Sequence, residues 1–215
     1  MLRQFSNRVV HSGAVLAAIV LALWAFTASG HEGVAEFVRK LGQTAIHELA
    51  PDGITQAERE TRFRALLQAN FDLPRITRFV LGRYVRSATP EQMTEFTTLY
   101  EDLMTLTYAR LFASYAGESF TVLREAGDPG SRYSLVLGQI GLPSGGAPIA
   151  LDWQILTSDD GSHRVVDLKV EGVSLAIAQR DEFTAVLDRN GGNIDALLDE
   201  IRGRIGKLRP GGGPR

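Results

Sequence analysis

The 215-residue sequence contains no cysteine and only four histidines. Without cysteine, the chain can form no disulfide, no thiolate metal site and no cysteine nucleophile. It also lacks a large excess of either charge, since 23 basic residues stand against 25 acidic ones. Domains that bind nucleic acid through general electrostatic attraction are basic overall. The composition therefore argues against thiol chemistry and against a nucleic-acid partner.

Long hydrophobic runs are absent except for one near the N-terminus. Residues 14–26 are all apolar, with Arg3 and Arg8 before them and the small residues of 27–30 after them. A run of about 13 residues is shorter than the roughly 20 needed to span a bilayer, and this order of segments is typical of a secretory signal peptide. An uncleaved N-terminal anchor is the alternative. We expect residues 1–30 to be a signal peptide that is removed on export.

The exported part, 31–208, is long enough for a single domain with its own hydrophobic core. Residues 209–215 are rich in glycine and proline and are typical of a flexible tail. Once Arg3 and Arg8 are removed, 21 basic residues face 25 acidic ones, which is a formal charge of −4. An exported domain without disulfides depends on its core for stability.

The first half of this domain is predicted to be helical. Apolar residues recur every three or four positions along 32–50, which indicates a helix with one buried face. Thr55 stands three residues before Glu58 in the pattern of a capping box, and it opens a helix that runs to about Asn70.

Two further helices follow. Asp72 is a good N-cap for a short helix that ends near Gly82. Thr89 and Gln92 form a second capping box around Pro90, and they open a long helix that should reach about Ser114.

From residue 119 the hydrophobic period changes from about 3.6 to 2. Four strands are predicted, at 119–126, 132–140, 148–157 and 163–171. Their connections are short, so neighbouring strands should pair antiparallel. Two amphipathic helices follow the strands. The expected fold is α+β, with N-terminal helices packed on one face of a curved four-stranded antiparallel sheet and helices again at the C-terminus.

Motifs for common catalytic sites are missing. The His47-Glu48 pair lacks the second histidine of the zinc-protease helix, and neither a nucleophile elbow nor a phosphate-binding loop is present. His163 stands four residues before Asp167, so on a regular strand the two share a face, and Asp152 lies nearby on another strand. In a cavity these groups could perform acid–base chemistry. On the outer face of a strand they are ordinary polar residues, and that reading is favoured.

Residues 71–92 combine basic and apolar side chains. Four arginines occur in this stretch, with aromatic and aliphatic residues between them: Arg75, Arg78, Arg83 and Arg86. On a short helix, Arg75 and Arg78 are neighbours on one face. A solvated helix face, a membrane-surface segment and the wall of an anionic ligand site remain open for this cluster.

The same stretch carries a resemblance to a known family. Residues 71–122, beginning "FDLPRITRFVLGRYVR", followed by "LDWQI" at 151–155 and "HRVVDLKVEGVSLAIAQRDEF" at 163–183, resemble the MlaC or toluene-tolerance family of periplasmic lipid-binding proteins. The resemblance covers about 34–208. A related branch associated with hopanoid lipids shares these motifs.

The resemblance implies a fold like the nuclear-transport-factor-2 cone, with an apolar cavity between sheet and helices that accepts lipid acyl chains. It implies a soluble periplasmic carrier without catalytic activity, metal or cofactor, whose ligand is phospholipid. The implied partners are an outer-membrane lipoprotein and porin complex and an inner-membrane ABC lipid transporter with its membrane-anchored lipid-binding subunit. The implied role is maintenance of outer-membrane lipid asymmetry.

We expect eight residues to include cavity-lining positions, some from the family pattern and the others from the predicted faces: Phe79, Tyr84, Phe96, Tyr100, Leu103, Tyr108, Trp153 and Ile155. Arg83 and Arg86 are the expected headgroup rim, because they lie beside Tyr84.

Two other functions remain open. The first is a cone-fold enzyme that uses His163, Asp152 or Asp167, which requires these side chains to point into the cavity. The second is an interaction module that binds no lipid, which requires a filled core.

Overall fold

A computed structural model describes residues 33–128 and 130–209, and these residues belong to one compact unit. The predicted signal peptide at 1–30 and most of the predicted tail lie outside the described residues. Within the part of the chain that the structure describes, no helix is long and apolar enough to cross a bilayer.

The described chain contains six α-helices and two 3-10 helices in addition to the sheet. Before the strands come α2 (Val34–Leu49), α3 (Gln56–Asn70), α4 (Leu73–Leu81), η1 (Gly82–Arg86), α5 (Pro90–Tyr108) and η2 (Ala109–Ser114), and after them come α6 (Leu175–Arg189) and α7 (Ile194–Leu208). The long helix expected to reach Ser114 therefore ends as an α-helix at Tyr108 and continues in the tighter 3-10 form, which is common at helix ends.

The helix starts predicted from the sequence are confirmed by their capping hydrogen bonds. The Thr55 hydroxyl accepts from the Glu58 amide at 3.1 Å, and the Asp72 carboxylate accepts from the Arg75 amide at 3.1 Å. At Thr89 the capping box is complete, since its amide also donates to the Gln92 side chain at 3.0 Å. Local side-chain chemistry thus determines where these helices begin.

The strands form one antiparallel sheet in sequence order: β1 (Ser119–Ala126), β2 (Tyr133–Gly141), β3 (Ile149–Thr157), β4 (His163–Val170) and β5 (Val173–Ser174). The first four match the predicted strands closely. The sequence prediction missed β5, which is only two residues long and leads directly into α6. Two register shifts interrupt the ladders, one in β1 next to Leu123 and one in β4 next to Val166. The fold is therefore α+β with five strands rather than four.

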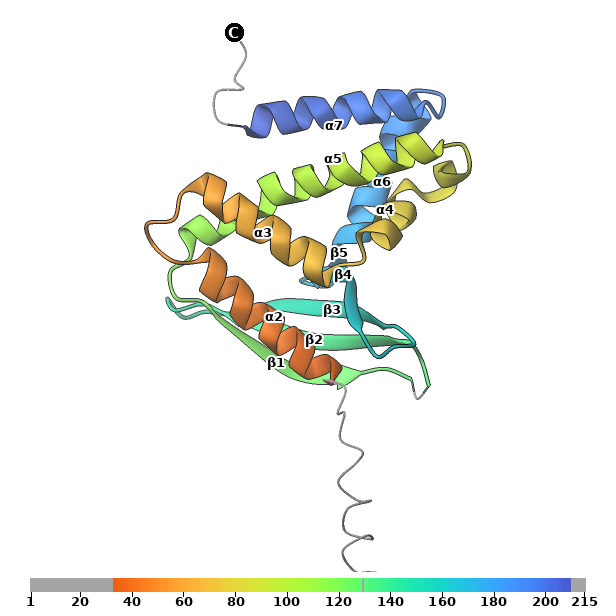
Figure 1. Ribbon diagram of the computed structural model, residues 1–215. Helices are drawn as coiled ribbons and strands as arrows, with labels where there is room; N and C mark the ends of the chain where they lie inside the picture. Colours follow the sequence, from red (N-terminus) through yellow and green to blue (C-terminus); the bar gives the residue numbers. More distant parts are fainter. Residues whose placement is uncertain (1–32, 129, 210–215) are drawn as a thin grey trace, which may run out of the picture. The chain divides into compact units, whose positions relative to one another are not determined.

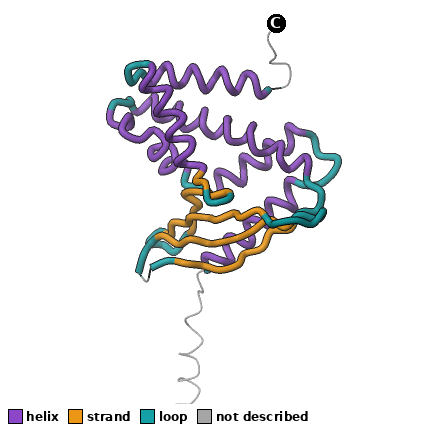
Figure 2. The backbone as a smooth tube through the Cα atoms, turned by 180° about the vertical axis from the view of Figure 1, so that it is seen from behind, coloured by secondary structure: helices purple, strands orange, loops and turns teal. Residues whose placement is uncertain are grey.

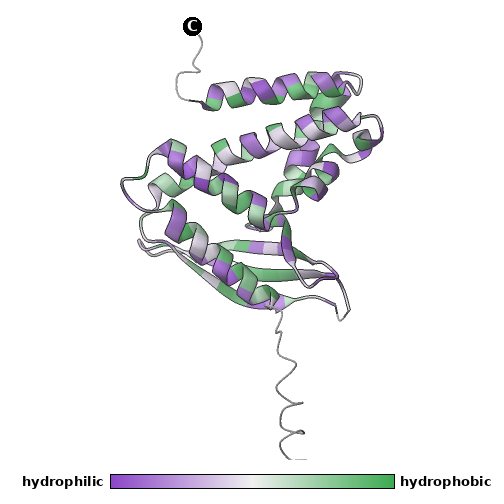
Figure 3. Cartoon of the chain, viewed as in Figure 1, coloured by the Kyte–Doolittle hydropathy of each residue, from purple (hydrophilic) through white to green (hydrophobic). Residues whose placement is uncertain are grey.

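The sheet is covered by helices on one face. Figure 1 shows α2 lying across this face, with α3, α5 and α6 beyond it, and Figure 2 shows the strands from the opposite side with no helix in front of β1, β2 and β3. In Figure 3, hydrophobic and hydrophilic residues alternate along the strands and along the helices, as expected where one face of each element is buried. Below, the covered face is called the inner face of the sheet.

Two groups of buried residues hold the unit together. The helical core is centred on Phe96, Phe183 and Leu197 from α5, α6 and α7, and the Phe96 and Phe183 rings meet edge to face with centroids 5.9 Å apart. The sheet core joins α2 to the inner face of the sheet through Val38 and Trp153. The cavity described next lies where these two groups meet.

Candidate functional site

A cavity of about 390 Å³ lies between the inner face of the sheet and the helices. Its walls come from α2, α3, α4, α5, η2 and α6 on one side and from β2, β3 and β4 on the other. Among the lining side chains, only four carry an oxygen atom: Tyr100, Tyr108, Asp167 and Gln179. None of the lining residues is a lysine or an arginine. Such a surface suits an apolar ligand or an apolar part of one.

Helical periodicity builds the helical walls. Leu41, Ala45 and Leu49 are four residues apart on α2, so their side chains follow one stripe that faces the cavity. From α3, Phe63 and Leu67 face it in the same way. The sequence predicted that the face of the first helix that carries these α2 residues is buried, but it did not assign that face, or the α3 residues, to a cavity.

Beside the cavity, α2 and the sheet approach each other closely around one aromatic ring of β1. The Phe120 ring of β1 meets Trp153 edge to face, with centroids 5.8 Å apart. A Cβ atom added at Gly42 of α2 would lie 2.2 Å from the Phe120 ring, and one added at Gly138 of β2 would lie 2.8 Å from it. The ring therefore occupies the space that two side chains would otherwise fill. We call this arrangement the Phe120 wedge.

Polar groups connect α5 and α6 at the cavity wall. The Tyr100 hydroxyl donates to the Gln179 side-chain oxygen, and the Gln179 amide nitrogen lies 3.0 Å from the sulfur of Met104. Burial raises the pKa of Tyr100 and, to a lesser extent, that of Tyr108, where Glu182 also contributes. Both phenols therefore remain protonated hydrogen-bond donors at neutral pH.

Asp167 is the one charged residue of the lining, and its carboxylate already accepts hydrogen bonds from neighbouring groups of the protein. It accepts hydrogen bonds from the Ser174 hydroxyl at 2.6 Å, the Ala176 amide at 3.0 Å and the Leu168 amide at 2.9 Å. These contacts bind the carboxylate to the first turn of α6, where a negative charge is stabilised by the helix dipole. Asp167 thus has a structural role in joining β4 to α6.

The structure corrects the expectation that His163 and Asp167 share a face. His163 pairs with Thr157 and Asp167 pairs with Gln154, three positions apart on β3, so the register puts the two on opposite faces. The cause is the irregularity next to Val166, which breaks the alternation. The His163 ring nitrogen contacts the Thr157 hydroxyl at 3.0 Å. Asp152, which pairs with Lys169, lies on the face opposite Trp153. The three polar residues do not converge in the cavity.

Three of the eight expected cavity residues line this cavity, namely Tyr100, Tyr108 and Trp153. The other five lie outside its lining, and a role for them in lipid binding stays a prediction. Phe96 and Leu103 face the helical core, because α5 is buried on more than one side. Ile155 is buried in the sheet core.

The remaining two expected cavity residues, Phe79 and Tyr84, lie nearer the surface. Phe79 is 41% exposed and lies under the guanidinium group of Arg180. Tyr84 is half-buried and donates a hydrogen bond to the Asp188 carboxylate.

The two arginines expected at a headgroup rim are not in the cavity lining. Arg83 forms an ion pair with Asp188 in the last turn of α6. The cavity is lined by the first turns of the same helix, which at 1.5 Å per residue is on the order of 15–20 Å away. Arg86 is exposed at the end of η1. A role for Arg83 and Arg86 at a headgroup rim stays a prediction.

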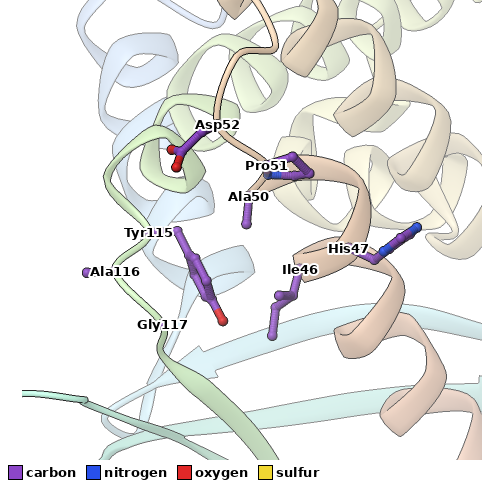
Figure 4. Close-up of a pocket in the computed structure, with 8 residues that line it drawn as sticks. All are labelled: Ile46, His47, Ala50, Pro51, Asp52, Tyr115, Ala116 and Gly117. Carbon is purple, nitrogen blue, oxygen red and sulfur yellow. The ribbon is translucent and has the colours of Figure 1, made fainter.

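A second hollow lies on the surface between the end of α2 and the segment after η2 (Figure 4). It is open and shallow. Figure 4 shows Tyr115 pointing toward Ile46 while His47 points away. The Tyr115 hydroxyl donates to the Glu118 carbonyl at 2.7 Å, so its polar group is already used. Among the described residues, no group of three or more histidine, cysteine, aspartate or glutamate side chains is placed to hold a metal ion.

Comparisons with known proteins agree with this geometry. The family model described as "MlaC protein" matches residues 39–203. The toluene tolerance protein ttg2D of Pseudomonas putida is 28% identical over 127 residues, which are 59% of this chain and 58% of that protein. The match thus spans less than two thirds of the relative's length.

One of the solved structures that match is a phospholipid-binding protein from Ralstonia solanacearum, determined in complex with a phospholipid. It superposes with a TM-score of 0.72 over 80% of this chain and 96% of that one, at 21% identity. At that identity the likeness establishes the fold.

Proposed function

This chain belongs to the MlaC family, and from that membership together with the cavity we propose that it is a lipid carrier that binds phospholipid acyl chains. The observation that carries the proposal is the apolar lining of the cavity. A lipid with two chains exposes about 30 methylenes, and moving them through water costs on the order of 20 kcal/mol at about 0.8 kcal/mol each. A carrier removes that barrier by covering the chains.

The lining also indicates which part of a lipid enters. No basic residue lines the cavity and Asp167 is fully hydrogen-bonded, so a phosphate inside would lose its hydration without gaining a charged partner. The headgroup of a bound phospholipid therefore stays at the mouth, in contact with water.

The volume suggests how much of the lipid the observed cavity holds. If a methylene takes roughly 30 Å³, about the volume of a water molecule in the liquid, 390 Å³ corresponds to about 13 methylenes. That is most of one acyl chain. A second chain requires the walls to move apart, and α2 and α3 are the elements whose displacement would enlarge the cavity.

The proposal extends to the place and partners of the carrier. The signal-peptide pattern at 1–30 supports export to the periplasm. There the protein would carry phospholipid between an outer-membrane complex and an inner-membrane ABC lipid transporter, and so maintain the lipid asymmetry of the outer membrane. It would do so without catalysis, because lipid transfer needs a shielded path and no covalent step. Both phospholipid and hopanoid-type ligands are outcomes of the test below.

Two observations support the carrier over its alternatives. An interaction module that binds no lipid predicts a filled core, and the cavity counts against it. An enzyme needs acid–base groups that are free to act in the cavity. His163 and Asp152 are not among its lining residues, and Asp167 is, but its carboxylate accepts three hydrogen bonds from Leu168, Ser174 and Ala176.

The test is native mass spectrometry of protein purified gently from its own host, with extraction and identification of any bound lipid. We expect the wild-type protein to carry lipid. The substitution Ala45→Trp should fill part of the cavity and lower the lipid-bound fraction at least about fivefold, while burial of the indole preserves stability.

The matched control is Ala185→Trp, which adds the same side chain at an exposed position of α6. It should leave the lipid-bound fraction unchanged. Wild-type protein that carries no lipid, or equal loss in both variants, would contradict the proposal.

A further inference from the structure

A surface with both basic and apolar character lies on the outer side of α4 and α6. These helices pack against each other, as Figure 1 shows. Their outward side chains include two apolar and three basic residues, which together we call the α4–α6 surface: Phe79, Ile177, Arg75, Arg78 and Arg180. No role in the cavity accounts for it, since none of the five lines that cavity.

The apolar members are unusually exposed. Phe79 is 41% exposed and Ile177 is 52% exposed, and Val173, on the short strand that leads into α6, is 60% exposed. Large apolar side chains that are exposed close together on a folded domain often mark an interaction site.

Two of the three basic members, Arg78 and Arg180, have no acidic partner among the described residues, whereas Arg75 is paired with Asp72. Arg62, Arg64, Arg202 and Arg204 each form an ion pair with a glutamate. Arg180 instead stacks on the Phe79 ring, 5.0 Å from its centroid, and within the described residues Arg78 has no side-chain hydrogen bond or ion pair.

The acidic residues near this surface leave it with a positive balance. Asp72 is paired with Arg75. Asp181 follows Arg180 on α6 and is exposed. Two arginines, Arg78 and Arg180, therefore stand against one unpaired acid, on a chain whose formal charge is −2.

From these observations we propose that the α4–α6 surface docks the protein on an anionic phospholipid bilayer. Phe79 and Ile177 would enter the interface between headgroups and acyl chains, and Arg75, Arg78 and Arg180 would bind lipid phosphates through their guanidinium groups. Basic residues near an anionic bilayer strengthen binding, and exposed apolar side chains add to this.

A bilayer suits this surface better than an acidic protein does. Neither Phe79 nor Ile177 lines either of the two hollows described above, and both side chains are exposed on the outer side of α4 and α6. Protruding apolar side chains fit into a fluid interface, whereas a folded partner would need matching pockets.

The surface also lies directly outside the cavity. Ile76 of α4 and Ala176 of α6 line the cavity, one turn from Phe79 and next to Ile177 respectively. The same two helices thus form the cavity wall on one side and the docking surface on the other. Docking would place a bilayer against the wall behind which a lipid chain is held.

The test measures binding to vesicles by co-sedimentation. One set of vesicles is phosphatidylcholine alone, and the other contains about one third phosphatidylglycerol. We expect the wild-type protein to bind the anionic vesicles and to lose this binding as NaCl is raised from about 0.1 M toward 1 M, because the Debye length falls from about 10 Å to about 3 Å.

The double variant Arg78→Glu/Phe79→Ala should weaken binding to the anionic vesicles at least about tenfold. The matched control is Arg124→Glu/Leu123→Ala, which changes an exposed arginine and an exposed apolar residue, also adjacent in sequence, on β1. It should bind as the wild type does. Arg78→Glu alone serves as a variant that disturbs no observed contact, and thermal unfolding checks that each variant is folded.

Equal weakening in both double variants, or none in either, would overturn the proposal. Wild-type protein that binds neutral and anionic vesicles equally would also overturn it. So would wild-type protein that binds neither kind of vesicle, and that result would leave a protein as the partner for this surface. Lipid occupancy of the same samples, measured by native mass spectrometry, separates this inference from the carrier function. An empty wild-type cavity counts against the carrier, whereas a loaded protein that ignores vesicles counts only against docking.

Discussion

In the helical core, Phe96 and Phe183 meet edge to face with centroids 5.9 Å apart, whereas farther along α5 the side chains of Tyr100 and Tyr108 border an open cavity. Both regions are built from apolar residues on the same helices. In the helical core, aromatic rings from facing helices fill the space between them. At the cavity, the element opposite the helices is the sheet. The Phe120 ring of the sheet packs against α2 and does not fill the cavity. Apolar composition alone therefore does not decide whether a layer is filled.

The two regions therefore contribute differently to the stability of the protein and to the binding of a ligand. The helical core joins α4, α5, α6 and α7, and close packing there supplies stability. The region around the cavity lacks part of that packing. A ligand in the cavity would supply the missing contacts and so stabilise the folded protein. The three predictions that follow test the contrast, from the largest expected effect to the smallest.

The first prediction compares equivalent truncations in the two regions. Leu197→Ala should lower the free energy of unfolding by about 3–4 kcal/mol, because it leaves a void in a filled core. Leu151→Ala, in the cavity wall, should cost only about 1–2 kcal/mol, because it enlarges a space that already exists. Urea unfolding of lipid-free protein measures both. Similar losses at the two sites would show that the contrast between filled and hollow regions is wrong.

The second prediction concerns the Phe120 wedge. In a helix, Gly42→Ala alone should gain about 1 kcal/mol from helix propensity. Here the new methyl group would lie 2.2 Å from the Phe120 ring, and overpacking typically costs 1–3 kcal/mol. We expect a net loss of up to about 2 kcal/mol.

The control for the wedge is the same substitution without the ring. In a Phe120→Ala background, Gly42→Ala should become stabilising, and a double-mutant cycle of unfolding free energies gives the coupling. Additive effects would mean that the ring does not constrain the approach of α2 to the sheet.

The third and smallest effect is a pH dependence at the edge of the helical core. The hydrogen bond from the Tyr84 hydroxyl, and then the nearby charge of Arg83, lower the pKa of Asp188 below its ordinary value of 3.8. Since the folded state favours the ionised form, this stabilisation is present above about pH 4 and is lost as the pH falls through the lowered pKa. Asp188→Asn should remove it.

Unfolding curves between pH 2 and pH 7 check this effect. The difference between wild type and Asp188→Asn should shrink toward acid pH, and the fraction of protein carrying lipid should not change, because Asp188 lies outside the cavity lining. A difference that persists unchanged at pH 2 would contradict the assignment.

Most of the fold could be predicted from the sequence because its signals are local. Thr55, Asp72 and Thr89 each cap a helix that begins immediately after them, and the change of period at 119 identifies the strands. The short strand β5 gave no signal of its own, since two residues are too few to show a period. The irregularity at Val166 could not be predicted from the sequence either, because it depends on how β4 pairs with β3.

The cavity was only partly predictable for the same reason. Tyr100, which was expected from the family pattern, and Tyr108 and Trp153, which were expected from predicted faces, line the cavity. Phe96 and Leu103 lie on α5 as well but face other helices, and which side of a doubly buried helix faces a hollow depends on packing across the whole domain. Gln179, which accepts a hydrogen bond from Tyr100 at the cavity wall, lies in a stretch that carries the family resemblance, but nothing in the sequence pairs it with Tyr100.

One last consequence concerns the two ends of the sheet. An antiparallel sheet that is not closed into a barrel presents strand edges to which another chain can add, and a protein that also exposes apolar side chains is at risk of aggregating in this way. Here β5 is too short to serve as a template. At the other end, β1 is interrupted next to Leu123 and continues with the charged residues Arg124 and Glu125. Both edge strands therefore disfavour pairing with strands of neighbouring molecules, which is the step by which fibrils grow.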